Sequence, residues 1–180
     1  MLAQPWGTLF VIFSSSAAGR VALLLTLALT TASAAQETSP RAVGPSGLPL
    51  PRFASLASSE VNVRTGPSTD HPIRWVYTRT ALPVRIVEES DVWRRVEDAD
   101  GETGWAHASL LSVRRTVIVL GPEIQDLRRS AATDGRVVAR LEPGVIAEFD
   151  HCEYDWCRVE VDDQRGWLPR ETIWGVGPGD

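Results

Sequence analysis

Several residue types that carry catalysis or bind metals are scarce in this chain. Its 180 residues include no lysine, one methionine, two cysteines and three histidines. The sequence also contains no GxSxG nucleophile motif, no HExxH metal motif and no glycine-rich phosphate-binding loop. We therefore expect a protein that is not an enzyme and that needs no cofactor.

Net positive charge is absent as well. All 18 basic residues are arginine, and 23 acidic residues bring the net charge to −5. The imbalance is greatest in residues 121–180, which hold seven arginines against thirteen acidic residues. Proteins that bind nucleic acid or anionic membranes present a basic patch and have a high isoelectric point. We therefore exclude both classes of partner.

Only one long apolar run is present, VALLLTLALTTASA, and it directly follows Arg20. Its end is rich in small residues, with Ala32 and Ala34 spaced for cleavage by signal peptidase. A membrane-spanning helix needs about 20 apolar residues, so we predict a signal peptide over residues 1–34 rather than an integral membrane protein.

No cysteine follows the run for lipid attachment, and the predicted location is the periplasm or the outside of the cell. The uncharged stretch before Arg20 suggests a translation start downstream of Met1.

The two cysteines, Cys152 and Cys157, lie five positions apart. In an exported protein a disulfide is the default interpretation of such a pair. His151 beside Cys152 suggests a metal site as the alternative, but a closed zinc site needs a fourth ligand, which this group lacks. We predict a disulfide and no metal.

A proline- and glycine-rich stretch, residues 35–52, has few large apolar residues and indicates an extended linker. Beyond it the chain repeats itself, because three landmarks recur in the same order at nearly constant separation. Val63-Arg64 matches Leu127-Arg128 at 64 residues, Trp93 matches Trp156 at 63, and Gly104-Trp105 matches Gly166-Trp167 at 62. We place the two repeats at residues 53–119 and 120–176.

Each repeat consists of short alternating apolar runs separated by turn residues. PVRIVEE and WRRVED are examples, and Asp100-Gly101 is a strong hairpin signal between two such runs. No run sustains the 3.6-residue period of a helix, so the sequence predicts two small all-β units. A catalytic pair of Cys152 and His107 would have to bridge these units, which is a further reason to expect no enzyme.

The order of these runs is that of a known family. VNVRTGPS, then PVRIVEE, then DGETGWAHASLL closely resembles the bacterial SH3-like domain family over residues 56 to about 115. The second copy departs from the pattern, because DLRRSAAT lacks the Gly-Pro of the first copy. The resemblance implies two tandem, small, partly open β-barrels. It also implies attachment to, or recognition of, cell-wall peptides, as in many relatives.

A tryptophan and an arginine alternate on one strand of each repeat. Counting by two places Trp93 with Arg95, and Trp156 with Arg158, on one strand face. These tryptophans are either covered by a loop or partly open, and an open one would suit a peptide through stacking and carboxylate pairing. In the first repeat we expect the loop of residues 68–72 to face Trp93. The candidate ligand-binding residues are Trp93, Arg95, Trp156, Arg158 and His71.

Four further residues are assigned structural roles. Trp105 and Trp167 each follow a glycine, which lets a large ring lie across a small core, so we expect both rings to be buried. Arg64 and Arg128 each end a strand. We expect each arginine to hold the loop that follows it, through carbonyl groups or an acid.

The tips of two equivalent hairpins differ between the repeats. Alignment places Glu89 and Arg94 of the first repeat where Cys152 and Cys157 lie in the second. Each pair flanks four residues. We therefore predict a cross-strand ion pair in one repeat and a disulfide at the same place in the other.

Two functions are compatible with these features. The leading one is a non-catalytic, exported binding module whose ligand is a peptidoglycan peptide. Because the acidic second repeat should repel carboxylate-rich peptides, this interpretation favours binding by the first repeat alone. The alternative is an adaptor whose ligand is another envelope protein, or the chain's own GLPLPR segment folded back along a barrel.

Overall fold

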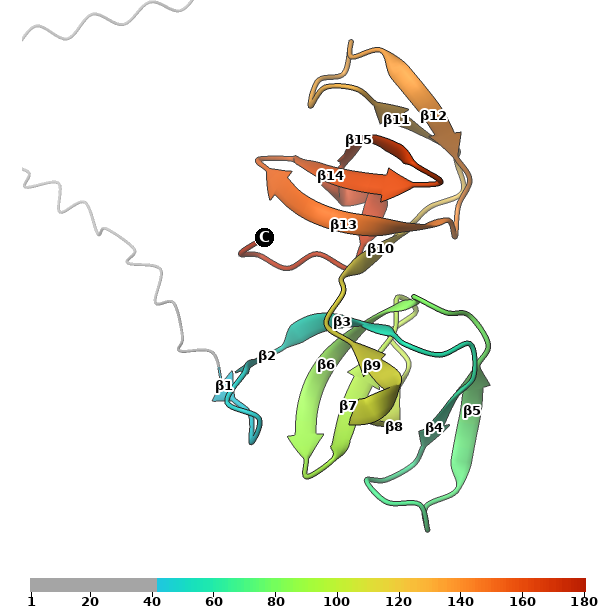
Figure 1. The fold of residues 1–180 in the computed structure, drawn as a ribbon, viewed down its shortest axis with the longest axis vertical. Coiled ribbons are helices and arrows are strands. Elements are labelled where there is room, and N and C mark those ends of the chain that lie inside the picture. Colours follow the sequence, from blue (N-terminus) through green and yellow to red (C-terminus); the bar gives the residue numbers. More distant parts are fainter. Residues whose placement is uncertain (1–41) are drawn as a thin grey trace, which may run out of the picture. The chain divides into compact units, whose positions relative to one another are not determined.

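The computed structural model describes residues 42–180 (Figure 1). The predicted signal peptide lies outside the described residues. Within residues 42–180, no helix is long and apolar enough to cross a membrane. The described part of the chain is all-β, with two seven-stranded antiparallel sheets and a separate two-stranded hairpin.

The first sheet, drawn mainly in green in Figure 1, corresponds to the first repeat. Its strand order is β5-β4-β8-β7-β6-β3-β9. The end strands β5 and β9 are not joined by hydrogen bonds, so the sheet forms a partly open barrel. Its elements are β3 (Arg52–Leu56), β4 (Val61–Arg64), β5 (Ile73–Tyr77), β6 (Pro83–Ser90), β7 (Trp93–Glu97), β8 (Thr103–His107), the 3-10 turn Ala108–Leu110 and β9 (Leu111–Ser112).

The second sheet, drawn mainly in orange, repeats this topology strand for strand. Its order is β12-β11-β15-β14-β13-β10-β16, and β12 and β16 are its end strands. The prediction of two tandem SH3-like barrels is confirmed. Its elements are β10 (Thr116–Val119), β11 (Gln125–Arg128), β12 (Val137–Leu141), β13 (Ile146–Glu153), β14 (Trp156–Val161), β15 (Gln164–Pro169), the 3-10 turn Arg170–Thr172 and β16 (Ile173–Trp174).

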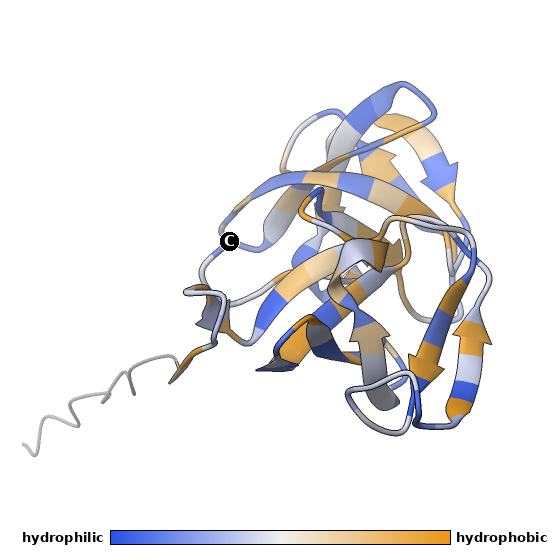
Figure 2. Cartoon of the chain, turned by 60° about the horizontal axis from the view of Figure 1, so that its bottom comes forward, coloured by the Kyte–Doolittle hydropathy of each residue, from blue (hydrophilic) through white to orange (hydrophobic). Residues whose placement is uncertain are grey.

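Each barrel has its own apolar core, built from alternate residues of its strands. Val61, Val84 and Val96 are among the fully buried residues of the first core, and Leu127 and Leu168 among those of the second. Figure 2 shows the matching alternation of apolar and polar residues along the strands. Because side chains of successive strand residues point to opposite faces, one face of each strand fills the barrel and the other is left outside.

Gly104 and Gly166 mark a close crossing of two strands in each barrel. A Cβ at Gly104 would lie 2.4 Å from Val63 Cγ1, and one at Gly166 would lie 2.7 Å from the carbonyl oxygen of Arg128. Glycine is therefore required where β8 crosses β4 and where β15 crosses β11.

Our expectation that Trp105 and Trp167 lie in the core is wrong. Both rings are only partly buried, and they lie on the face of their strands that points away from the core. The physical reason is the alternation along a strand. The glycine itself faces the core, so the residue after it must face out.

A short hairpin precedes the first barrel. Strands β1 (Ala42–Val43) and β2 (Pro49–Leu50) pair around a turn, and Leu50 packs against the first core. The hairpin lies close to Glu89 of β6, since a Cβ at Gly44 would be 2.3 Å from Glu89 Oε2. Part of the predicted linker therefore folds back on the first barrel.

The two barrels also contact each other directly. Thr116 Oγ1 donates a hydrogen bond to the carbonyl of Ala81 at 2.6 Å. Arg79 Nη2 donates to the carbonyl of Gly144 at 2.9 Å. These bonds join β10 and the loop before β13 to the loop before β6.

Candidate functional site

Four of the five predicted binding residues lie on the outer face of the equivalent strands β7 and β14. In the first barrel, Trp93 and Arg95 of β7 stand opposite His107 and Trp105 of β8. In the second barrel, Trp156 and Arg158 of β14 stand opposite Pro169 and Trp167 of β15. We call these two sets of four residues the outer faces of the first and second barrels.

The outer face of the first barrel is closed. Trp93 is only 8% exposed, and its ring meets that of His107 edge-on with centroids 5.4 Å apart. Arg95 is exposed, but its Nη1 is 3.3 Å from Glu88 Oε2. Trp93 therefore offers little surface on which a ligand could stack.

The outer face of the second barrel is more open. Trp156 is partly exposed and lines a hollow of about 440 Å³ together with Pro169 and Arg170. Asp155 and Glu171 line it as well, so the charged lining residues are two acids and one arginine. An indole and a proline ring beside carboxylates can hold an apolar group that carries a positive charge.

Arg158 does not share this hollow. It lines a second one of about 290 Å³, where its Nε is 3.8 Å from Asp150 Oδ2. The ring of Trp167, which stands opposite Arg158 in the ladder, meets His151 edge-on with centroids 5.4 Å apart. The predicted pair of Trp156 and Arg158 is therefore split between neighbouring hollows.

His71, the remaining candidate, is exposed in the loop between β4 and β5. Its ring packs over Gly66, where a Cβ would be 2.4 Å from His71 Nε2. Arg64 Nη1 donates to the carbonyls of Thr69 and His71 at 3.0 and 2.7 Å. The loop is thus organised by its own arginine, and a ligand-binding role for His71 stays a prediction.

The predicted role of the two strand-ending arginines is confirmed. Arg64 holds two carbonyls of the loop that follows it. Arg128 Nη1 likewise donates to the carbonyl of Gly135 at 2.8 Å, and its Nη2 donates to Asp126 at 3.0 Å. The recurring arginine is therefore part of the scaffold.

The predicted difference between the hairpin tips is also confirmed. Glu89 and Arg94 are cross-strand neighbours, with Arg94 Nε 3.1 Å from Glu89 Oε1. Cys152 and Cys157 are neighbours in the same register of the second barrel and form a disulfide. The two barrels close one hairpin in two chemically different ways.

Glu89 is the most strongly perturbed acid of the first barrel. Its side chain is fully buried, and burial by itself would raise its pKa. Hydrogen bonds from the backbone N–H of Ser46, from Arg52 and from the Ser46 hydroxyl outweigh that effect and lower the pKa of Glu89 to about 2. Glu89 therefore stays ionised and ties the N-terminal hairpin to the barrel.

Sequence reasoning missed two features of the outer faces. The histidines that meet tryptophan rings, His107 and His151, were not predicted as partners, although His107 lies directly opposite Trp93 in the ladder. The place of Arg170 beside Trp156 depends on the 3-10 turn after β15. Among residues 42–180, no group of three His, Cys, Asp or Glu side chains could hold a metal ion.

Comparisons with known proteins agree with this architecture. A family model described as the bacterial SH3 domain matches residues 57–112 and again residues 121–175. A putative N-acetylmuramoyl-L-alanine amidase, YrvJ from Bacillus subtilis (strain 168), is 22% identical over 135 residues. That match covers 69% of this chain but only 26% of the amidase.

Two solved structures share lower similarity. An NlpC/P60 family protein from Bacillus cereus ATCC 10987 is 13% identical with a TM-score of 0.31, over 69% of this chain and 56% of that one. NlpC2 from Trichomonas vaginalis is 8% identical with a TM-score of 0.33, over 70% of this chain and 48% of that one. The chain therefore spans about half of each of these proteins, and TM-scores this low do not identify a shared overall arrangement.

Proposed function

The chain belongs to the bacterial SH3 domain family, and from this premise we propose that it is a binding module of the cell envelope whose ligand is a peptidoglycan peptide. The observation that carries the proposal is the hollow beside Trp156. The hollow exposes an aromatic ring, and the tryptophan that carries this ring recurs at the same position in both repeats. The name of one relative, a putative N-acetylmuramoyl-L-alanine amidase, supports a ligand in peptidoglycan.

Binding by the second barrel is favoured over binding by the first. Trp93 is buried, whereas its counterpart Trp156 lines a hollow. The acidic character of the second repeat, which argued against it as a receptor for carboxylates, favours a different part of a peptide. Asp155 and Glu171 attract an amine, and the face of the Trp156 indole adds a cation–π contact.

The proposal places the protein outside the cytoplasm, in the periplasm or beyond the cell. Support comes from the predicted signal peptide and from the disulfide, which persists in an oxidising compartment. The proposal includes no catalytic step. With Cys152 and Cys157 joined, neither cysteine is free to act as a nucleophile.

A second candidate function, that of a protein-interaction adaptor, is favoured by one observation. The segment around Pro49 and Pro51 is already folded back, with Leu50 against the core of the first barrel. A barrel that holds its own proline-containing segment could hold a similar segment of another envelope protein.

Co-sedimentation with purified peptidoglycan sacculi tests the proposal. The unmodified protein should pellet with sacculi. The Trp156→Ala variant should lose about tenfold in affinity, because the cation–π contact between a charged amine and the indole contributes about 1 to 2 kcal/mol. Tyr154→Asn is the matched control. Tyr154 is an aromatic residue two positions away, 95% exposed at the hairpin tip, and its loss should leave binding unchanged.

The outcome also separates the two candidate functions. Unmodified protein that remains in the supernatant would contradict wall binding and favour the adaptor. Equal retention of the Trp156→Ala and unmodified proteins would move the site away from the second barrel's outer face. Release of soluble fragments from the sacculi would contradict a purely binding role.

A further inference from the structure

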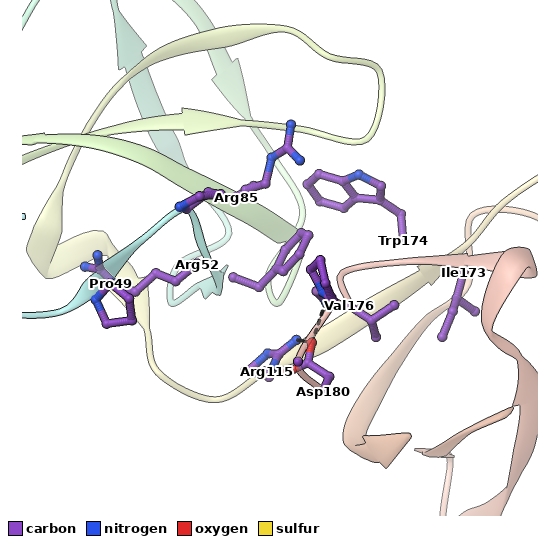
Figure 3. Close-up of a pocket in the computed structure, with 13 residues that line it drawn as sticks. Pro49, Arg52, Arg85, Arg115, Ile173, Trp174, Val176 and Asp180 are labelled. Carbon is purple, nitrogen blue, oxygen red and sulfur yellow. Dashed lines mark hydrogen bonds and ion pairs between the residues drawn. The ribbon is translucent and has the colours of Figure 1, made fainter. Parts of the chain in front are cut away.

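A larger cavity lies away from both outer faces, between β3 of the first barrel and the segment that follows β16 (Figure 3). Its volume is about 550 Å³. Phe53 and Trp174 form one wall, meeting edge-on with ring centroids 5.1 Å apart. We call this cavity the arginine cleft, because Arg52, Arg85 and Arg115 all line it.

The charge of the cleft is opposite to that of the protein. Its thirteen lining residues include three arginines and one acid, Asp180, so the lining carries 3 − 1 = +2. The whole chain carries −5. A positive, partly enclosed site on an acidic protein is suited to an anionic ligand.

The guanidinium groups of the cleft are incompletely paired. Nη1 of Arg52, Nε of Arg85 and Nε of Arg115 are buried and have no hydrogen-bond partner among the described residues. Arg52 shares its acid, Glu89, with Arg94, and Arg85 pairs with Glu97 at 2.5 Å. A guanidinium has five N–H donors, and buried donors without partners cost free energy. Each of the three arginines therefore keeps one N–H without a partner after pairing with its acid.

One carboxylate already occupies the cleft. Both oxygens of Asp180 accept from Arg115, Nη2 to Oδ2 at 2.7 Å, as the dashed lines in Figure 3 indicate. The backbone N–H of Gly177 also donates to Asp180. Burial would raise the pKa of Asp180, but these hydrogen bonds outweigh it and lower that pKa, so the side chain is charged.

The chain around Asp180 lies in the cleft much as a bound peptide would. Gly177 lies beside the Phe53 ring, because a Cβ added at Gly177 would be 3.9 Å from Phe53 Cδ2. Arg170 donates to the carbonyl of Gly177. A glycine- and proline-containing backbone thus lies on an aromatic surface while its carboxylate makes a bidentate pair with arginine, the geometry that gives such pairs their specificity.

We propose that the arginine cleft is a second binding site, specific for a peptide that carries a carboxylate, and that Asp180 is an internal competitor for that site. The ligand's carboxylate takes the place of Asp180 on Arg115, and its neighbouring residues take the place of the 177–180 turn beside Phe53. This site differs from the hollow at Trp156 in position and in the charge it selects, so either proposal can fail without the other.

The test uses the full chain and a short synthetic probe. The probe is the acetylated, amidated peptide Gly-Val-Gly-Pro-Gly-Asp, whose side-chain carboxylate is its only charge, and the control probe has Asn in place of Asp. Binding is followed by the NMR shift of the Trp174 indole N–H, which lies in the cleft wall. The Trp174→Phe variant identifies that signal.

Removal of the competitor should strengthen binding. An attached group competes at an effective concentration in the millimolar range, so the Asp180→Ala variant should bind the Asp probe more tightly than the unmodified protein, by about tenfold for a site whose Kd is about a tenth of that concentration. The Asn probe should bind that variant about tenfold more weakly, since a charge-assisted pair is replaced by a neutral hydrogen bond.

Loss of a cleft arginine should reverse the gain. Adding Arg115→Gln to Asp180→Ala should remove most of the binding, and adding Arg85→Gln provides a second test that leaves the Arg115 site intact. Arg95→Gln, an exposed arginine of the first barrel's outer face, is the matched control and should have no effect.

Several results would overturn the proposal. These are equal affinity for the Asp and Asn probes, no saturable shift of Trp174 in the Asp180→Ala variant, or equal binding with and without Arg115. Displacement of the probe by inorganic phosphate at the same concentration as by acetate would also contradict it, because the site would then select charge alone rather than a carboxylate.

Discussion

The two barrels share one topology but differ at two matching points. At the tip of the β6–β7 hairpin, Glu89 and Arg94 form an ion pair, and at the tip of the β13–β14 hairpin Cys152 and Cys157 form a disulfide. The register of the two pairs is the same. The two barrels therefore join the same position across the strands by different chemistry.

The difference has a consequence for what each barrel can hold. A disulfide satisfies both cysteines, whereas Glu89 has oxygens left for Ser46 and Arg52. The Glu89–Arg94 ion pair can therefore bind a further segment besides its own two strands, and in the first barrel that segment is the N-terminal hairpin. On the outer faces the relation is reversed, because the first barrel is closed at Trp93 and the second is open at Trp156.

The largest effect should come from breaking the ionic junction. In Glu89→Gln, Arg52 and Arg94 lose a buried counter-charge, and the free energy of unfolding of the first barrel should fall by about 3 kcal/mol. The N-terminal hairpin should detach, which hydrogen exchange of Ser46 can detect. Glu88→Gln, the exposed neighbour, should change stability by well under 1 kcal/mol. Equal losses in the two variants would show that Glu89 is not the junction.

Alanine at the crossing glycines should be nearly as harmful, and in both barrels. Gly166→Ala forces a Cβ against Leu127 and the Arg128 carbonyl, and Gly104→Ala forces one against Val63. Overpacking of this kind costs about 1 to 3 kcal/mol, and we expect the larger loss for Gly166→Ala because the backbone is closer there. Urea unfolding measures both. A neutral effect at either glycine would contradict the close crossing.

Breaking the covalent junction should have a smaller effect. Reduction of Cys152–Cys157 opens a short loop, which in the chain-entropy view removes about 2 kcal/mol of stability. The loss should be confined to the second barrel, so the Trp167 indole signal should disappear at a lower urea concentration while the Trp93 signal is unchanged. Simultaneous loss of both signals would show that the barrels unfold as one unit.

The titration of Glu89 should have the smallest effect on stability near neutral pH, because this group changes its charge only in acid. Its pKa is lowered from 4.5 to about 2, so its stabilising effect is fully present above pH 4.5 and is lost as the pH falls towards 2. The first barrel should therefore lose stability between these pH values. Glu89→Gln should remove this part of the pH dependence, and a profile unchanged by that substitution would assign it to other acids.

The features that could be predicted from the sequence are local ones. The tandem barrels follow from three landmarks at nearly constant separation. The Glu89–Arg94 and Cys152–Cys157 pairs each lie within one hairpin, where the positions of both strands are set by a short turn. The hold of Arg64 on its own loop is local as well.

The features that could not be predicted depend on distant segments. Whether Trp105 faces in or out depends on which residue of β8 meets β4, some 40 positions earlier in the chain. The arginine cleft brings Arg52 and Arg115 together with Asp180, and no spacing in the sequence links these three. Periodicity shows which residues share a strand face, but it does not show which segment packs against that face.

The most direct test of wall binding is an NMR titration of the unmodified protein with soluble muropeptides that carry a free amine. The six tryptophans that follow the predicted signal peptide give indole N–H signals that single Trp→Phe variants can assign. We expect a saturable shift of Trp156 and no shift of its buried counterpart Trp93. A saturable shift of Trp93, or no shift of any indole, would contradict the account.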